Sequence, residues 1–291
     1  MRTWLILCLF TMAFILAACQ TNESIDFTAA PWLKNLAVEK TSGGDLAIQP
    51  INRSSVRFEF RGQQYYVDPS GDADWDRMPK ADVIFVSHEH GDHLDLAAIA
   101  KITQKHTVVY TSAATIEKVK SEKDKPENLP TFYLIVHGKP KKLRNIDVTY
   151  WNLAMLDASG PHISELQDGD DKPFDITVEA VPAYNMSEGK LNFHPKDRKD
   201  NGYVLTFGNK RVYIACDTEA TPEMKALKNI DIALLPCDPR YTMSVEEAVE
   251  AAKIIKPKIF YPYHQGPSDP NEAAKLLAGE KEIEVRVLSL P

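Results

Sequence analysis

The stretch His88-Glu89-His90-Gly91-Asp92-His93 constrains this chain more than any other feature. Three imidazoles and two carboxylates fall within six residues, one residue after the apolar run 83–86. An alternating His-x-His places two ligands on one side of an extended segment, and the adjacent Asp92-His93 pair supplies a second set close by. Such ligands suit Zn²⁺, with Mn²⁺ or Fe²⁺ as alternatives. The pattern predicts a site for two divalent metal ions rather than a histidine-rich surface loop.

The N-terminus resembles a lipoprotein signal. Arg2 precedes an apolar segment, and Leu16-Ala17-Ala18-Cys19 places small residues before a cysteine. The segment is short for a membrane span, and polar residues follow it. We therefore expect removal of residues 1–18 as a signal peptide and lipidation of Cys19, with a plain membrane anchor or a cleaved secretory signal as the alternatives.

This signal predicts where the protein works. A lipid on Cys19 would anchor it to a membrane of the bacterial cell envelope, on the periplasmic side, and residues 19–40 would form a tether. Gln20 follows the cysteine in place of an acidic retention residue, which favours the outer membrane.

The remaining range, 41–291, is long enough for one large α/β domain with a sizeable core. The formal charge of the whole chain is −7, and its basic residues are scattered. This charge pattern argues against a nucleic-acid partner. The sequence indicates no oligomeric state.

Of the four cysteines, Cys216 and Cys237 lie in this domain. They could form a disulfide in an oxidising compartment, but both end apolar, strand-like runs. Because free cysteine often serves as a small buried hydrophobe, we favour two buried thiols.

Strands and helices alternate along the domain. Strands are expected at 55–60, 64–67, 81–87, 107–111, 203–207, 211–215, 230–236 and 258–261, and helices at 95–101, 113–120, after Thr221, after the capping box of Ser244 and Glu247, and from Asp269 to Gly279. Asp217 and His264 each come just past a strand, as the histidine cluster does. Functional residues gather at strand ends in α/β proteins, so we expect these groups to meet.

At this point the chain resembles the metallo-β-lactamase superfamily. His88-x-His90-x-Asp92-His93 is similar to its signature, and the later order of Asn185, His194, Cys216-Asp217 and Tyr263-His264 resembles its branch of L-ascorbate-6-phosphate lactonase-like hydrolases. The resemblance covers roughly residues 45–290. It implies a four-layer αββα sandwich of two mixed β-sheets, with metals at one edge.

The resemblance also implies roles for individual residues. His88 and His90 would bind the first metal, Asp92 and His93 the second, Asp217 would bridge the two, and His264 would complete the second site. Where relatives commonly supply a third first-site histidine, this chain has Asn185, so either Asn185 or His194 is expected there, or the site lacks that ligand. Glu89 would either support a ligand or be an exposed spacer.

Two further departures concern Cys216 and an insertion. Cys216 replaces the glycine that commonly precedes the bridging aspartate. Its thiolate could join the second metal, but a small buried residue is the preferred interpretation. Residues 137–171 form an inserted loop region relative to compact relatives, and they are either a substrate lid or a surface excursion.

These observations predict a metal-dependent hydrolase. A hydroxide held by two metals would attack a lactone, ester, amide or phosphoester, and Asp92 and Asp217 would orient it and pass its proton. The substrate would be a small molecule or a lipid. The alternatives are a phosphodiesterase acting on envelope phospholipid, similar to N-acyl-phosphatidylethanolamine phospholipase D, and a metal-binding lipoprotein without catalysis. The third alternative is an iron-dependent oxidoreductase with a flavin partner.

Overall fold

The computed structural model describes residues 36–135, 137, 141–142 and 176–287, all within one unit, Asn35–Pro291. The expected signal segment, Cys19 and most of the insertion at 137–171 lie outside the described residues. Among the described residues, no helix has both the length and the apolar character needed to span a bilayer.

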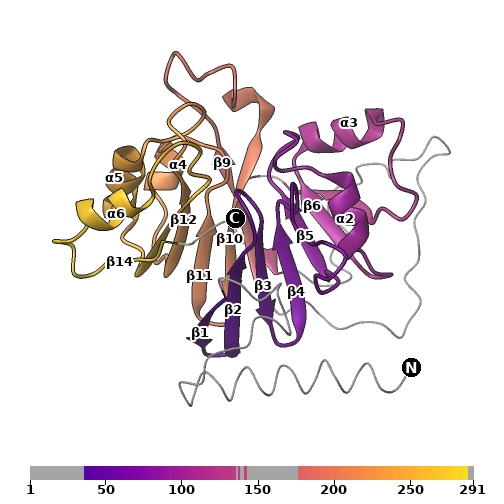
Figure 1. Cartoon of the computed structure of the whole chain (residues 1–291), viewed down its shortest axis with the longest axis horizontal. Coiled ribbons are helices and arrows are strands. Elements are labelled where there is room, and N and C mark those ends of the chain that lie inside the picture. The colour runs from indigo at the N-terminus through magenta and orange to yellow at the C-terminus, as the bar shows by residue number, and fades with distance from the viewer. Residues whose placement is uncertain (1–35, 136, 138–140, 143–175, 288–291) are drawn as a thin grey trace. The chain divides into compact units, whose positions relative to one another are not determined.

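Two mixed β-sheets form the centre of this unit (Figure 1). The first contains, in order, β1 (Ala37–Thr41), β2 (Gly44–Pro50), β3 (Val56–Phe60), β4 (Gln63–Val67), β5 (Val83–Val86), β6 (Val108–Thr111) and β7 (Thr131–Leu134). The second contains, in order from one edge to the other, β8 (Lys141–Lys142), β9 (Ile176–Ala183), β10 (Asp200–Phe207), β11 (Lys210–Ile214), β12 (Ile232–Pro236), β13 (Ile259–Tyr263) and β14 (Glu284–Val285). Each sheet is antiparallel at one end and parallel at the other.

The main core lies between the two sheets. In β3, Val56, Phe58 and Phe60 face this core and alternate with Arg57 and Glu59, because successive side chains of a strand point to opposite faces. Phe207 of β10 sits among three aromatic rings of the first sheet, with centroid distances of 5.5 to 5.6 Å. Each such pair contributes about 1 kcal/mol beyond simple burial, so these rings fix how the sheets pack.

Helices cover the outer face of each sheet (Figure 1). They are α2 (Leu96–Ile102) and α3 (Ala113–Ser121) beside the first sheet, and α4 (Pro222–Lys225), α5 (Val245–Ile255) and α6 (Asn271–Leu276) beside the second. The expected capping box of Ser244 and Glu247 is present at the start of α5. The predicted αββα sandwich is confirmed.

The folded unit begins earlier than the expected boundary at residue 41. Ala37–Thr41 form β1, which pairs antiparallel with β2 around the turn at Ser42 and Gly43. The last residues of the range expected as a tether therefore belong to the first hairpin, because their backbone pairs with β2.

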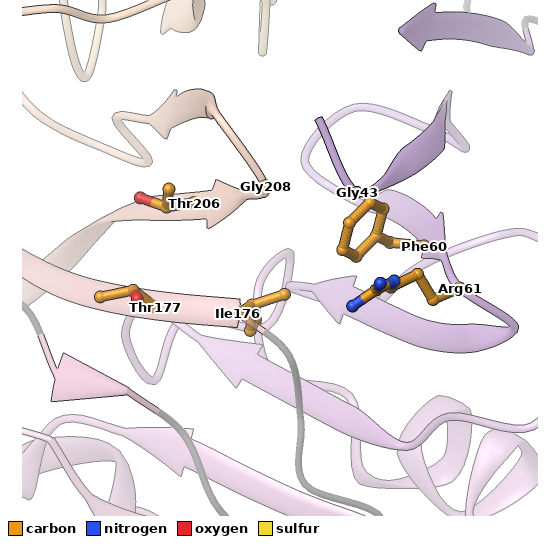
Figure 2. Close-up of a pocket in the computed structure, with 7 residues that line it drawn as sticks. All are labelled: Gly43, Phe60, Arg61, Ile176, Thr177, Thr206 and Gly208. Carbon is orange, nitrogen blue, oxygen red and sulfur yellow. The ribbon is translucent and has the colours of Figure 1, made fainter. Parts of the chain in front are cut away.

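One pocket of about 210 Å³ lies where β1 and β2 turn, next to the turn between β10 and β11 (Figure 2). Its lining includes Phe60, Thr206 and Gly208. Phe207 is the last residue of the eight-residue β10, whose first residue, Asp200, lies beside the predicted site. At about 3.3 Å per residue the strand spans roughly 20 Å, so this pocket is at the opposite end of the sandwich from the histidine cluster.

Candidate metal centre

The predicted ligands come from separate strand ends that meet at one edge of the two sheets. The histidine cluster follows β5, Asp217 follows β11, and His264 follows β13. The structure forms three groups whose ligand atoms lie within 4.8 Å of one another: His88, His90 and His194; His88, His93 and Asp217; Asp92, His93 and His264. All six residues proposed as ligands from the sequence are therefore brought together, and His194 joins them.

The first of these groups consists of imidazoles only. His88 Nε2 lies 3.1 Å from His90 Nδ1, and the His194 ring is 4.9 Å from each of the other two rings. Burial lowers the pKa of His90 to about 4, and the neighbouring His194 and Arg198 add to this effect. His90 is therefore neutral at pH 7, the state that a metal ligand requires.

His194 reaches the first group through a chain excursion that starts after β9. The excursion leaves at Asn185 and returns at His194, and the Asn185 N–H donates to the His194 carbonyl at 2.8 Å. The side-chain amide of Asn185 donates to the carbonyls of Lys190, at 3.1 Å, and Tyr241, at 2.7 Å. The geometry thus favours His194 as the third ligand. Asn185 instead stabilises the excursion through its hydrogen bonds.

The second site is formed by Asp92, His93 and His264, and Asp217 lies between it and the first group. Asp92 Oδ2 lies 3.3 Å from His264 Nε2. Asp217 Oδ1 lies 3.4 Å from the Nε2 atoms of His93 and His264, and its Oδ2 lies 3.4 Å from His194 Nε2. One oxygen of Asp217 thus faces each ligand group, which is the placement that a bridging ligand needs.

The side chains fit a pair of metal ions. His93 Nε2 and Asp217 Oδ1 are buried without a hydrogen-bond partner among the described residues. Leaving such atoms unsatisfied costs about 1 to 3 kcal/mol each, and a cation between them would remove that cost. Burial raises the pKa of Asp217, but the nearby His264 and His93 outweigh it and hold the pKa well below its usual range. Asp217 is therefore an anion at the centre of the cluster.

Asp68, which follows β4, supports His93 from behind. Its Oδ2 lies 2.8 Å from His93 Nδ1 and accepts a hydrogen bond from the Ser87 hydroxyl, and its Oδ1 accepts from the Ser87 N–H. A carboxylate on the outer nitrogen fixes the ring and leaves Nε2 to face the site. Burial lowers the pKa of His93, but Asp217 and Asp68 raise it well above the usual value. The sequence analysis missed Asp68, although its position after a strand was a usable signal.

Arg198 supports the other side of the centre, and it was also missed. The guanidinium lies 3.1 Å from His90 Nε2 and 3.2 Å from His194 Nδ1. It pairs with Glu89 at 3.1 Å and with Asp200. Glu89 is therefore a partner of this arginine rather than an exposed spacer.

The two domain cysteines are free and buried, so the preferred interpretation as thiols is confirmed. Cys216 has a φ of +57°, a conformation that glycine adopts without steric cost. This explains why a glycine suits the position before Asp217. Burial raises the pKa of the Cys216 thiol well above its usual value, and Cys216 belongs to none of the three ligand groups in the described part of the chain.

Comparisons with known proteins identify the family of this chain. Residues 54–265 match the beta-lactamase superfamily domain. A UPF0173 protein of Pyrococcus abyssi is 30% identical over 209 residues, which cover 71% of this chain and 77% of that protein. A UPF0173 metal-dependent hydrolase of Pelotomaculum thermopropionicum is 28% identical over 222 residues, covering 72% and 80%.

A crystal structure shows the same fold. A protein of Parabacteroides distasonis, named as a metal-dependent hydrolase, is 35% identical to this chain, with a TM-score of 0.70 over 89% of this chain and 100% of that one. The fold and the match over 54–265 define a metallo-β-lactamase sandwich. The chain belongs to the metallo-β-lactamase superfamily, and the prediction of an enzyme of the metal-dependent hydrolase class is confirmed.

Proposed function

We propose that this chain hydrolyses a lactone, ester, amide or phosphoester at a centre of two divalent metal ions, with Zn²⁺ as the expected metal and Mn²⁺ or Fe²⁺ as alternatives. The observation that carries the proposal is the position of Asp217, whose two oxygens each lie 3.4 Å from a histidine of a different ligand group. His88, His90 and His194 would hold one ion, and Asp92, His93 and His264 the other. When bound, the two ions supply Lewis acidity and lower the pKa of coordinated water to about 7.

The protein's own groups divide the remaining work. Asp217 is buried and its side chain is only 4% exposed, whereas the Asp92 side chain is 43% exposed. Asp217 therefore fixes the position of one ligand group relative to the other. Asp92 Oδ2 is placed to take a proton from the nucleophile and release it toward solvent. Asp68 positions the imidazole of His93, and no serine or cysteine nucleophile is needed.

Metal content tests this function directly. The chain from Gln20 onward would be purified, loaded with Zn²⁺ and analysed for bound metal, together with His90→Ala and Asp217→Ala. His106→Ala is the matched control, because this histidine is 49% exposed and pairs with Asp82 away from the ligand groups. We expect two equivalents in the wild type and the control, fewer in the other two variants, and hydrolysis of chromogenic esters that follows metal content.

Other outcomes separate the alternatives. Two bound equivalents with no turnover of any lactone, ester, amide or phosphodiester would indicate a protein that binds metal without catalysis. Absence of bound metal after reconstitution would contradict the proposal. Visible absorbance of the purified protein would point to redox-active iron instead.

A phosphodiesterase acting on envelope phospholipid is the second candidate. The excursion before His194 exposes three large apolar side chains, Met186, Leu191 and Phe193, next to a proposed ligand. Apolar groups at such a position suit a lipid chain. Release of a soluble headgroup from phosphatidylethanolamine vesicles, lost in Asp217→Ala, would support this candidate over a small-molecule hydrolase.

We also propose that the enzyme is a lipid-anchored protein of the bacterial cell envelope, facing the periplasm and residing at the outer membrane. The support is the sequence around Leu16-Ala17-Ala18-Cys19 and Gln20. Labelled fatty acid should enter the wild-type protein and be absent from Cys19→Ser. Fractionation of the two membranes would then show which one carries it.

A further inference from the structure

A pair of arginines beside the second ligand group points to the kind of substrate. Arg53 lies at the turn before β3, and its carbonyl accepts a hydrogen bond from the His264 N–H at 3.1 Å. Arg53 Nε lies 4.0 Å from Asp92 Oδ2. The Arg53 side chain therefore stands at the edge of the proposed metal centre, on the side of Asp92 and His264.

Arg240 joins Arg53 through a shared carboxylate. Asp238 follows β12, and its Oδ2 accepts from Arg53 Nη2 at 2.9 Å and from Arg240 Nη2 at 2.7 Å. Asp238 Oδ1 accepts from Arg240 Nε at 3.0 Å. Burial raises the pKa of Asp238, but hydrogen bonds from Arg240 and the charge of Arg53 outweigh it and lower the pKa. A single carboxylate therefore orients two guanidinium groups.

Local packing holds Asp238 and the Arg240 guanidinium in place. Gly266, two residues after His264, has a φ of +51°, and a Cβ there would lie 2.1 Å from Asp238 Oδ2 and 2.9 Å from Arg240 Nη2. Only glycine leaves room for this approach. The Arg240 guanidinium also lies 5.1 Å from the centre of the Tyr241 ring, a cation–π distance that restricts its orientation.

Charge and exposure distinguish this pair from a structural ion pair. Asp238 is fully buried, whereas the side chains of Arg53 and Arg240 are 42% and 53% exposed. Two cations share the buried anion Asp238. The other carboxylate near Arg53, Asp92 at 4.0 Å, is a proposed metal ligand, so with metal bound a positive charge remains at the surface. Guanidinium groups bind carboxylates and phosphates through paired hydrogen bonds.

We propose that Arg53 and Arg240 bind an anionic group of the substrate, a carboxylate or a phosphate, while the scissile bond lies at the metal centre. This inference rests on the proposed hydrolase function and specifies its substrate class. Arg53 and Arg240 act as specificity residues, and Asp238 positions them.

A pair of matched esters tests the proposal. Mono(4-nitrophenyl) succinate carries a free carboxylate, and 4-nitrophenyl butyrate has an acyl chain of the same length without it. We expect the metal-loaded wild type to prefer the anionic ester in kcat/KM, and the ratio of the two kcat/KM values to fall about tenfold in Arg53→Gln and in Arg240→Gln, as loss of a charged hydrogen bond predicts. Arg53→Lys should retain part of the preference, and Arg77→Gln, which alters an exposed arginine paired with Asp74, should leave the ratio unchanged.

A binding measurement separates this inference from the hydrolase proposal. Calorimetric titration of the metal-loaded protein with inorganic phosphate and with acetate should show tighter binding in the wild type than in the double variant Arg53→Gln/Arg240→Gln, at equal metal content, and would show which anion is preferred. If neither ester is hydrolysed but this difference persists, the anion site stands, and the hydrolase proposal fails only if lactones, amides and phosphodiesters are not hydrolysed either. If the double variant binds both anions as the wild type does, or if both esters lose rate equally, the arginines are structural and the inference is wrong.

Discussion

The two ligand groups of the centre differ in charge and in what supports them. His88, His90 and His194 are imidazoles, and the cation of Arg198 lies behind two of them. The other group, with His93 and His264, includes the carboxylate of Asp92, and the anion of Asp68 lies behind His93, whereas Asp217 is shared by both groups. An anion behind a histidine strengthens its hold on a metal, whereas a cation weakens it. We therefore expect the second site to bind metal more tightly than the first.

The largest expected effect comes from the first site. His194→Ala should lose one metal equivalent and lower kcat/KM by at least about a hundredfold, because two imidazoles then remain beside the shared Asp217. Elemental analysis and ester hydrolysis would measure both quantities.

Asn185→Ala is the comparison for that variant. It should keep two equivalents but lower the free energy of unfolding by about 1 to 3 kcal/mol, because two partly buried carbonyls lose their donor. Loss of metal in Asn185→Ala with no loss in His194→Ala would reverse the assignment of the third ligand.

Asp68→Asn should weaken the second site by about 10- to 100-fold, as loss of a carboxylate behind a ligating histidine does elsewhere. Competition with a chelator of known affinity would give the two stepwise constants. If Asp68→Asn changes the weaker of the two constants, which we assign to the first site, the proposed order of the two metal affinities is incorrect.

Replacing Arg198 should strengthen metal binding, by a smaller factor than Asp68→Asn weakens it. When the inner nitrogen of His90 binds a metal, the outer one carries a proton, and a guanidinium can only donate. Arg198→Met should therefore tighten the first site by about three- to tenfold, corresponding to roughly 1 kcal/mol of relieved repulsion. The same chelator titration measures it, with Lys196→Met, an exposed cation two residues earlier, as the control. Weaker metal binding at the first site of Arg198→Met would show that the ion pairs of Arg198 with Glu89 and Asp200 matter more than its repulsion of the metal.

The smallest effect is expected at Cys216. Cys216→Ala should keep two metal equivalents, since the thiol is buried and its pKa is raised well above the usual value, so that it stays protonated at neutral and mildly alkaline pH. Loss of one equivalent would make the thiolate a ligand of the second site.

The sequence alone was sufficient for the features that local patterns encode. The sandwich, the strand ends and the meeting of the six expected ligand side chains at one edge followed from the histidine motif, the alternation of strands and helices, and the family resemblance. His194 stayed one of two choices because the path of the excursion after Asn185 depends on hydrogen bonds to Lys190 and Tyr241, which no spacing reveals.

The supporting charges could not be read in the same way. Arg198 lies 108 residues from His90, and Arg53 lies 185 residues from Asp238, so only the folded chain brings them together. An isolated arginine or aspartate in a loop carries no local signal of its partner. The boundary near residue 41 was missed for a related reason, since β1 gains its structure from pairing with β2.

The excursion between Asn185 and His194 carries both exposed apolar side chains and a proposed metal ligand. Phe193, exposed and packed edge-on against Tyr241 at 4.9 Å, is bonded directly to the residue proposed as the third ligand. An insertion, deletion or repacking in this loop would therefore alter metal retention. It would also alter the packing of Tyr241, whose ring contacts Arg240. Substrate range and metal dependence are thereby coupled, and variants that change one should be screened for the other.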